Sequence, residues 1–478
     1  MTNNSIGYIA GGGLKENLRV RLTVPSQQVQ EGAFVVIDSS PWRFYGLVTD
    51  LQLGATDPRF ADEQSETRFP PELARLLHGQ TLFTNLEVLP ALMREIGPDP
   101  GDPAYPAWRE ANPKDPLPLP VKTIPPHHAQ VGLAQEGDIA EIFGRADEKG
   151  NFVIGYTREQ GHPVCINLEK FVQRSAGVFG ATGTGKSFLT RIVLAGLIHY
   201  NAASVLVLDM HNEYGFDDTS SDTKQNVPGL KTKFQARVRV VGLGSGAQIR
   251  GKTPDFNLEV ARKDIAPEDI ELLTRELNLK ETTPTTLEAL VSSFGREGWF
   301  SAFRELRYGA VIEDDNGKKV PAPDSVAAWA FGAGVNTAAA EGLHSKLGRL
   351  FNKPYIVEKP AADSISEVIK TLEAGQHVVL SFGEHETDLD YLLVSNLLTR
   401  RIREAWEKRT NEFRSGKDAE PRPLVIVVEE AHKLLNREMA AQTTFSTIAR
   451  EMRKYYVTLL IIDQRPSQIY DEVMSQLG

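Results

Sequence analysis

The stretch GATGTGKS, Gly180 to Ser187, decides the fold of this 478-residue sequence, because it matches the pattern G-x-x-x-x-G-K-[ST] in full. The apolar run Ala176–Phe179 precedes it, and the helical run FLTRIVLAGLI follows it. Between a strand and a helix, the glycines turn backbone N–H groups inward around phosphate, and the helix N-terminus adds a favourable dipole. A chance glycine-rich turn would lack these flanks. The stretch therefore predicts a P-loop that binds ATP.

The side chains of this P-loop have separate expected roles. Lys186 is expected to reach the β- and γ-phosphates of ATP, and the Ser187 hydroxyl is expected to ligate Mg²⁺. The expected nucleotide contacts are Gly180, Ala181, Thr182, Gly183, Thr184, Gly185, Lys186, Ser187 and Phe188.

Two acidic residues follow another apolar run, Leu424–Val428. In a P-loop site, one carboxylate of such a pair supports the Mg²⁺ shell and the next polarises the attacking water. We assign Glu429 to the metal and Glu430 to the water. Acids at a strand end are common in isolation, but a fully apolar strand and an upstream P-loop favour the catalytic interpretation. The nearby His432 either senses the γ-phosphate or packs beneath the loop.

A third apolar run, Thr458–Ile462, ends at Asp463 and Gln464. A polar amide beside a P-loop can bind the γ-phosphate or the attacking water and report hydrolysis to neighbouring structure. We interpret Gln464 as a sensor of this kind.

The rhythm of the chain from Ser175 onward predicts an α/β core. Continuous apolar runs separated by helical patterns are typical of a parallel sheet that is buried on both faces. These runs lie at 176–179, 205–208, 238–241, 378–382, 424–428 and 458–462. Helical spacing replaces them in the middle of the region, where Pro267 suits a first helical position. We expect a core of residues 169–256 and 373–478, with an α-helical insertion at 257–372.

Residues 1–168 show short strands instead. Leu18–Val24 alternates apolar with polar residues, and Ala33–Ile37 and Phe44–Val48 are short apolar runs. This spacing predicts a small β-barrel, with Asp138–Phe143 as one more strand. Proline-rich pieces between about residues 56 and 128 predict an insertion or a surface excursion.

Composition limits the class of protein. The chain is 41% hydrophobic and 24% charged, as in a globular protein, and its net charge of −10 restricts any nucleic-acid site to a local patch. The lone Cys165 cannot form an internal disulfide, which favours a reducing cytoplasm. The N-terminus lacks the features of a signal peptide, and polar residues interrupt the most apolar stretch, Ile192–Met210, so we expect no membrane span.

Several segments together resemble the HerA branch of the HerA/FtsK ATPases. They are LDMHNEY (Leu208–Tyr214), VEEAH (Val428–His432), IAREMRKYYV (Ile448–Val457) and IIDQRPS (Ile461–Ser467). The resemblance covers nearly the whole chain. It implies a RecA-like P-loop ATPase core with a parallel sheet, an N-terminal small β-barrel of the HAS-barrel type and an inserted α-helical bundle.

The resemblance also implies a homo-hexameric ring that translocates double-stranded DNA through its centre. Its nucleotide sites would lie at subunit boundaries and be completed by a neighbour's arginine. Arg450 and Arg453 match the family's arginine-bearing segment, and Arg174 matches the arginine that precedes its P-loop. An arginine delivered in trans stabilises phosphoryl transfer and couples hydrolysis to assembly, whereas the alternative for each residue is a surface ion pair.

Two departures from the family pattern are visible. The family's core normally continues beyond QRPS into a further strand and a C-terminal arm that braces the next subunit, and this sequence stops at Gly478. Asp463 stands where the family often has a small or hydroxylated residue.

The leading functional hypothesis is a DNA-translocating motor that works with a nuclease or another effector in DNA-end processing or phage defence. After the paired acids, Lys433, Arg437, Arg450, Arg453 and Lys454 outnumber Glu438 and Glu451, so a ring of subunits would have a positive channel. A solvated basic helix is the alternative for this stretch. A different functional class is an ATP-dependent scaffold ring that recruits and regulates an effector. The effector is expected to dock on the N-terminal barrel.

Overall fold

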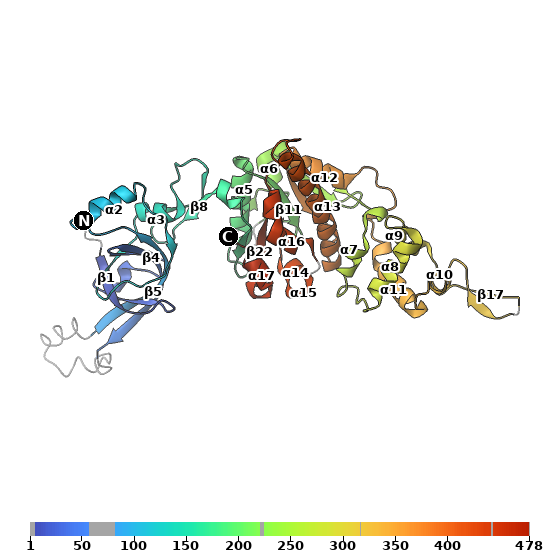
Figure 1. Cartoon of the computed structure of the whole chain (residues 1–478), viewed down its shortest axis with the longest axis horizontal. Helices are drawn as coiled ribbons and strands as arrows, with labels where there is room; N and C mark the ends of the chain where they lie inside the picture. Colours follow the sequence, from blue (N-terminus) through green and yellow to red (C-terminus); the bar gives the residue numbers. More distant parts are fainter. Residues whose placement is uncertain (1–4, 57–81, 220–223, 316, 441–442, 478) are drawn as a thin grey trace. The chain divides into compact units, whose positions relative to one another are not determined.

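The computed structural model describes residues 5–56, 82–219, 224–315, 317–440 and 443–477 (Figure 1). The chain divides into two compact units, Met1–Asn167 and Leu168–Gly478, and each is described by itself. None of the described helices combines the length and the apolar character that a membrane crossing requires.

The first unit is built around a closed β-barrel. Its strands are β1 (Ser5–Gly11), β2 (Leu18–Leu22), β3 (Phe34–Ser39), β4 (Trp42–Ala55), β5 (Leu82–Glu95), β6 (Leu119–Pro120) and β7 (Gln130–Leu133). They pair in the order β2-β1-β7-β3-β4-β5-β6, and a further β2–β5 pairing closes the barrel. Residues two apart on one strand face the barrel core together, as Val35 and Ile37 do with 0% exposure. The three strands predicted in this region and the small barrel are confirmed.

One predicted barrel strand is wrong. Asp138–Phe143 lies in a helix, α3 (Glu136–Phe143), in which Ile139 is the buried residue. The Gln135 backbone N–H donates to the Asp138 carboxylate at 2.8 Å, a contact that favours the first turn of a helix. The segment just before this helix forms β7, a strand that was not predicted and that pairs with both β1 and β3.

The prediction of an insertion or surface excursion between about residues 56 and 128 is wrong for residues 82–95, where Leu86, Val88 and Met93 are buried in the barrel core. The long strand β5 lies in this region, and its pairing with β4 extends from Trp42 to Ala55. The short helix α2 (Tyr105–Ala111) follows, while residues 57–81 lie outside the described part of the chain. The unit ends with the hairpin of β8 (Asn151–Tyr156) and β9 (Pro163–Asn167).

A seven-stranded parallel sheet forms the centre of the second unit. Its strands are β10 (Ala176–Phe179), β11 (Ser204–Asp209), β14 (Val238–Leu243), β15 (Phe256–Leu258), β20 (His377–Ser381), β21 (Leu424–Val428) and β22 (Val457–Asp463). The spatial order is β10-β22-β21-β11-β20-β14-β15. All residues of β11, β20, β21 and β22 are buried, so both faces of the sheet are covered, as the continuous apolar runs predict.

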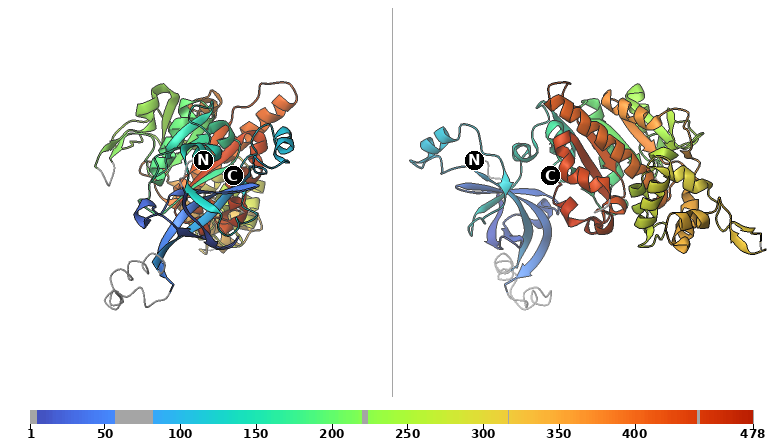
Figure 2. Two further views of the ribbon diagram at one scale, coloured as in Figure 1. Left: turned by 90° about the vertical axis from the view of Figure 1, so that its left-hand side faces the viewer. Right: turned by 45° about the vertical axis from the view of Figure 1, so that its right-hand side comes forward.

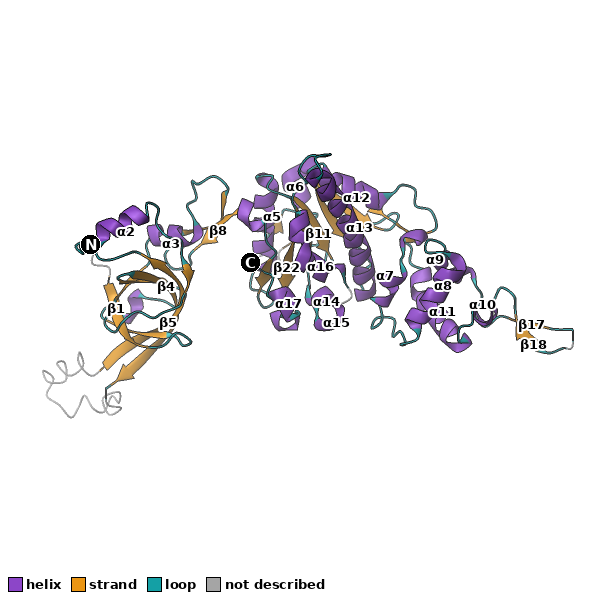
Figure 3. Ribbon diagram, viewed as in Figure 1, coloured by secondary structure: helices purple, strands orange, loops and turns teal. Residues whose placement is uncertain are grey.

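Helices lie on both sides of this sheet (Figures 2 and 3). They are α4 (Leu168–Phe171), α5 (Lys186–His199), α6 (Leu230–Phe234), α12 (Ser364–Glu373), α13 (Asp388–Arg414), α14 (His432–Leu435), α15 (Arg437–Ala440), α16 (Thr444–Glu451) and α17 (Asp471–Met474). A short hairpin of β12 (Asp218–Thr219) and β13 (Asn226–Val227) follows β11.

The segment between β15 and β20 is mainly helical. It contains α7 (Pro267–Glu271), α8 (Thr283–Phe294), α9 (Trp299–Glu305), α10 (Val326–Gly332) and α11 (Thr337–Phe351). Two short strands, β16 (Val260–Ala261) and β19 (Ile356–Val357), pair at its base, and a hairpin of β17 (Val311–Glu313) and β18 (Lys319–Pro321) extends from it. Pro267 is the first residue of α7, as its missing N–H favours.

The side chain of Asn396 on α13 joins two distant segments. Its Nδ2 donates to Asp269 Oδ1 of α7 at 3.1 Å, and its Oδ1 accepts from both the N–H and the hydroxyl of Thr444 at 3.1 Å. Arg400 Nη2 also donates to Asp269 Oδ2, at 2.8 Å. Burial raises the pKa of Asp269 although Arg400 opposes the shift. The buried carboxylate is thus paired and hydrogen-bonded, as a charge in a protein interior requires.

His377, at the start of β20, generates a prediction about stability and pH. It is 1% exposed, and neither ring nitrogen has a hydrogen-bond partner among the described residues. Burial, together with the positive charges of Arg237 and Arg422, lowers its pKa from 6.5 to about 3. The folded protein therefore keeps the ring neutral, while the unfolded chain takes up a proton below about pH 6.5.

Stability associated with His377 should be present above pH 6.5 and fall as the pH decreases toward 3. The expected loss between pH 7 and pH 5 is about 2 kcal/mol of unfolding free energy. Urea unfolding of wild type and His377→Leu at both pH values measures it, with the exposed His199→Gln variant as control. An equally steep loss in His377→Leu would contradict the assignment.

Candidate active site

The P-loop joins the end of β10 to the start of α5. Its bend depends on Gly183 and Gly185, whose φ angles of 79° and 91° lie in the region that disfavours side chains. The loop places the N-terminus of the 14-residue α5 at the carboxyl edge of the sheet. Its free N–H groups and the helix dipole suit an anionic ligand.

Two side chains of the P-loop contact the loop's own backbone. Lys186 Nζ donates to the Ala181 carbonyl at 2.9 Å, and Thr184 Oγ1 donates to the same oxygen at 2.7 Å. Ser187 is half-buried beside them, and Phe188 is 65% exposed. Among the described residues, the partner of Lys186 is thus a neutral carbonyl, which a phosphate oxygen would replace with a stronger, charge-assisted contact.

The paired acids follow β21 and occupy different environments. Glu429 is 6% exposed, and its Oε2 is buried without a hydrogen-bond partner among the described residues. Burial raises the pKa of Glu429 well above its usual value, and the negative charges of Asp209 and Glu213 add to the shift. Glu430 is half-buried and has a φ of 45°, which is strained for a residue other than glycine.

Gln464 connects the P-loop to Glu430. Thr182 Oγ1 donates to Gln464 Oε1 at 2.6 Å, and Gln464 Nε2 donates to Glu430 Oε1 at 3.2 Å. The two ends of one amide thus contact the phosphate-binding loop and the second acid. The structure brings these three residues together, although Thr182 and Gln464 are 282 positions apart.

Asp209 at the end of β11 is a site residue to which the sequence assigned no role. Its carboxylate is fully buried and accepts backbone N–H groups of Glu213 at 2.7 Å and Tyr214 at 2.9 Å. Burial raises the pKa of Asp209 despite these bonds. Because β11 and β21 are parallel neighbours with Leu208 opposite Val428, the next residues, Asp209 and Glu429, follow at the same edge. The resemblance of LDMHNEY to the family segment was the signal available in the sequence.

A cavity of about 540 Å³ opens between the P-loop and the strand tips. Its lining includes Thr182, Gly183, Gly185, Lys186, Ser187, Phe188, Arg191, His211, Glu213, Glu429, Glu430, Asp463 and Gln464. Arg191, which sequence reasoning missed, lies on α5 and donates to the Glu213 carbonyl. The cavity therefore combines a phosphate-binding loop, two cations of α5 (Lys186 and Arg191) and several carboxylates.

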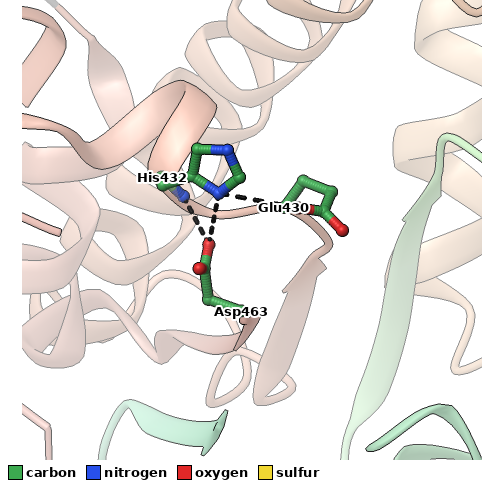
Figure 4. Close-up of side chains that lie close together, drawn as sticks. All are labelled: Glu430, His432 and Asp463. Carbon is green, nitrogen blue, oxygen red and sulfur yellow. Dashed lines mark hydrogen bonds and ion pairs between the residues drawn. The ribbon is translucent and has the colours of Figure 1, made fainter. Parts of the chain in front are cut away.

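His432 does not line this cavity. Its Nδ1 lies 2.9 Å from Asp463 Oδ2 and 3.5 Å from Glu430 Oε2, and its backbone N–H donates to the same Asp463 oxygen at 2.7 Å (Figure 4). The ligand atoms of these three residues lie within 4.8 Å of one another, the spacing of a possible metal site. Mg²⁺ prefers oxygen ligands, however, and the imidazole already bonds to Asp463. We therefore interpret the group as a hydrogen-bonded cluster.

A second cavity, of about 590 Å³, has His432 in its lining. We call it the basic cavity; its lining includes Arg275, Glu276, Asp388, His432, Lys433, Asn436, Arg437, Glu438, Arg465 and Gln468. Lys433 Nζ lies 2.7 Å from Asp388 Oδ1, so its charge is already paired, whereas Arg437 is exposed.

The structure does not bring the three candidate arginines to the P-loop cavity. Arg174, Arg450 and Arg453 are exposed, and none is among the residues lining that cavity. Arg450 Nη1 lies 3.4 Å from Glu472 Oε2, an ion pair in which both side chains are about half exposed. Within one chain, then, the site has no arginine from these positions.

Comparison with known proteins adds the family. Residues 152–402, more than half of the chain, match the family described as "Helicase HerA, central domain". "DNA double-strand break repair helicase HerA" of Sulfolobus acidocaldarius is 24% identical over 481 residues, which cover 99% of this chain and 82% of that relative. The protein of the same name from Pyrococcus furiosus is 23% identical over 338 residues, covering 66% of this chain and 57% of that relative.

Among solved structures, the "Bacterial conjugative coupling protein TrwBdeltaN70" is 13% identical, with a TM-score of 0.42 over 72% of this chain and 74% of that chain. The assignment rests instead on the family match, which extends from β8 through most of α13 and includes the whole P-loop. The chain belongs to the HerA helicase family, and its second unit is the catalytic core of an ATP hydrolase.

Proposed function

We propose that this chain is an ATP-driven motor that translocates double-stranded DNA as a homo-hexameric ring. The observation that carries the proposal is the arrangement around Glu430. Glu430 has two neighbours. One is Gln464, which also contacts the P-loop, and the other is His432, which lines the basic cavity. A motor needs such a connection between the nucleotide site and a surface for the polymer. Relatives named as DNA double-strand break repair helicases support DNA as that polymer.

In this mechanism Lys186 and the P-loop N–H groups bind the phosphates of ATP. Ser187 and Glu429 would hold Mg²⁺, which neutralises charge that develops on the phosphates. The donor set fits this ion, because the hydroxyl and the carboxylate are hard oxygen ligands. The buried Oε2 of Glu429 also fits, because it has no hydrogen-bond partner in the described part of the chain and a cation would compensate the negative charge of the ionised carboxylate.

Glu430 would accept a proton from the attacking water, while Gln464 orients the same water or the γ-phosphate. The contact between Gln464 and Thr182 supports this role, because a phosphate bound at the P-loop would compete for that amide. Loss of the Thr182 contact would let Gln464 move, and Glu430 would be affected because Gln464 Nε2 donates to it.

The ring would complete each nucleotide site with Arg174, Arg450 or Arg453 of a neighbouring subunit. Their exposure, and their absence from the lining of the P-loop cavity of their own chain, support delivery in trans. The N-terminal barrel, which has a core of its own, would dock a nuclease or another effector for DNA-end processing or phage defence.

Substitutions at the paired acids test the division of roles. Glu430→Gln should bind ATP but lower kcat by about 10²–10⁴-fold, because only water activation is removed. Lys186→Ala should abolish hydrolysis because the phosphates are deprived of their main side-chain partner. Steady-state ATPase assays with separate measurement of ATP binding distinguish the two. Wild-type turnover in Glu430→Gln with an inactive Glu429→Gln would reverse the assignment.

Duplex DNA should bind the ring and stimulate ATP turnover. Affinity should fall with salt, and Arg437→Ala should make the logarithmic slope shallower by about 0.9 for each DNA phosphate that the arginine neutralises. Lys433→Ala should change the slope less, because Asp388 already pairs with its charge. Fluorescence anisotropy across a salt series measures the slopes. If duplex DNA left the ATPase rate of an intact ring unchanged, the scaffold hypothesis would be favoured.

Mixed rings test completion of the site in trans. A Lys186→Ala subunit cannot use its own site but can lend its arginines, and a subunit lacking Arg450 and Arg453 has the opposite defect. Mixing the two should recover part of the activity that neither shows alone. Each variant incubated with itself is the control. No recovery in rings shown to contain both variants would rule out sharing of these two arginines.

A further inference from the structure

Glu430 is held at both carboxylate oxygens by groups anchored to the tip of β22. Gln464 Nε2 donates to Oε1 at 3.2 Å, and His432 Nδ1 lies 3.5 Å from Oε2. The φ of 45° at Glu430 is unfavourable for a side-chain-bearing residue, so surrounding contacts must maintain its direction. The position of the carboxylate therefore depends on both neighbours.

Asp463 anchors the histidine. It is 1% exposed, and its Oδ2 accepts from both the backbone N–H and Nδ1 of His432, at 2.7 and 2.9 Å. Its Oδ1 accepts from the Arg465 N–H at 2.5 Å. A buried carboxylate with three hydrogen bonds is a rigid acceptor, and it fixes which edge of the imidazole faces Glu430.

The residues of this cluster are divided between the linings of the two cavities. Asp463 and Glu430 line the P-loop cavity, whereas His432 lines the basic cavity. Figure 4 shows the second ring nitrogen of His432 on the side away from Asp463 and Glu430. One imidazole thus has Nδ1 committed to the catalytic acid and its anchor, and Nε2 directed away from them.

The charges of the basic cavity suit a phosphate. Arg275, Arg437 and Arg465 have no carboxylate within 4.0 Å in the described part of the chain. The pair of Lys433 with Asp388 is neutral, and Glu276 and Glu438 leave a net positive charge. Arginines that lack an acidic partner are available for bidentate contacts with phosphate oxygens.

We propose that His432 is a positioning residue that couples occupancy of the basic cavity by a nucleic-acid phosphate to the placement of Glu430, with Asp463 as its anchor. This inference rests on the proposed function, because it names the regulation of the same ATPase site. A phosphate oxygen that binds Nε2 fixes the orientation of the imidazole ring. The ring then holds Oε2 of Glu430 in place, while Gln464 holds Oε1.

Three variants of the full chain test the coupling through kcat with and without saturating duplex DNA. His432→Ala should lower the stimulation ratio at least about fivefold, roughly the lower limit of a typical coupling energy, while DNA affinity stays within about threefold. In His432→Asn the side-chain N–H of asparagine can donate to Asp463 in place of Nδ1. If His432→Ala lowers the kcat measured without DNA, His432→Asn should recover part of that loss, but it should not recover the stimulation by DNA. Arg437→Ala is the matched control. It should require a higher DNA concentration for half-maximal stimulation but show the wild-type stimulation ratio at saturating DNA.

The outcomes separate the two proposals. Undiminished stimulation in both His432 variants overturns the coupling and leaves the motor intact. A wild-type ring that neither binds duplex DNA nor responds to it overturns the proposed function and the coupling together. If His432→Ala fails to fold by thermal unfolding, the ratio in His432→Asn decides. A wild-type ratio in that variant counts against the coupling.

Discussion

All strands of the central sheet run parallel, and this single constraint assembles the active site. The carboxyl ends of parallel neighbours must meet at one edge. β10 delivers the P-loop there, β21 the paired acids, β22 Asp463 and Gln464, and β11 Asp209. The fully buried strands hold these tips in register, because a shift of any strand would expose its apolar residues or break its ladder of hydrogen bonds.

The same crowding makes the site electrostatically costly. Asp209 and Glu429 are both buried, and burial raises the pKa of each. Two buried carboxylates repel each other when both are ionised. A positive charge placed beside the P-loop would therefore be stabilised by them. Arg191 and Lys186 line the P-loop cavity, but both donate to backbone carbonyls, and Arg191 Nη2 also lies 3.8 Å from Asp218 Oδ2. The metal ion of a bound metal–nucleotide complex would supply such a charge and reduce the repulsion between the two carboxylates.

Sequence patterns predicted the parts of the molecule that depend on local chemistry. The P-loop, the apolar strands and Pro267 each leave a mark in a few consecutive residues, and the structure has these elements in those places. Strand order leaves no such mark, so the proximity of Asp209 to Glu429 and the position of Arg191 were missed. The pattern of Asp138–Phe143 favours a strand although the segment is helical, because short apolar runs do not distinguish the two. The environment of His432 depends on Asp463, thirty-one positions away, and could not be inferred from its neighbours in sequence.

The side-chain amide of Asn396 has a mechanical consequence. An amide group is planar and rigid, so its nitrogen and oxygen move as one body. Here the nitrogen binds Asp269 of the helical segment between β15 and β20, and the oxygen binds Thr444 in the segment between the paired acids and β22. A rotation of α13 that carries one partner along must displace or break the bond to the other. The helical segment between β15 and β20 and the segment between Glu430 and Gln464 are therefore joined by side-chain hydrogen bonds that involve no strand of the sheet.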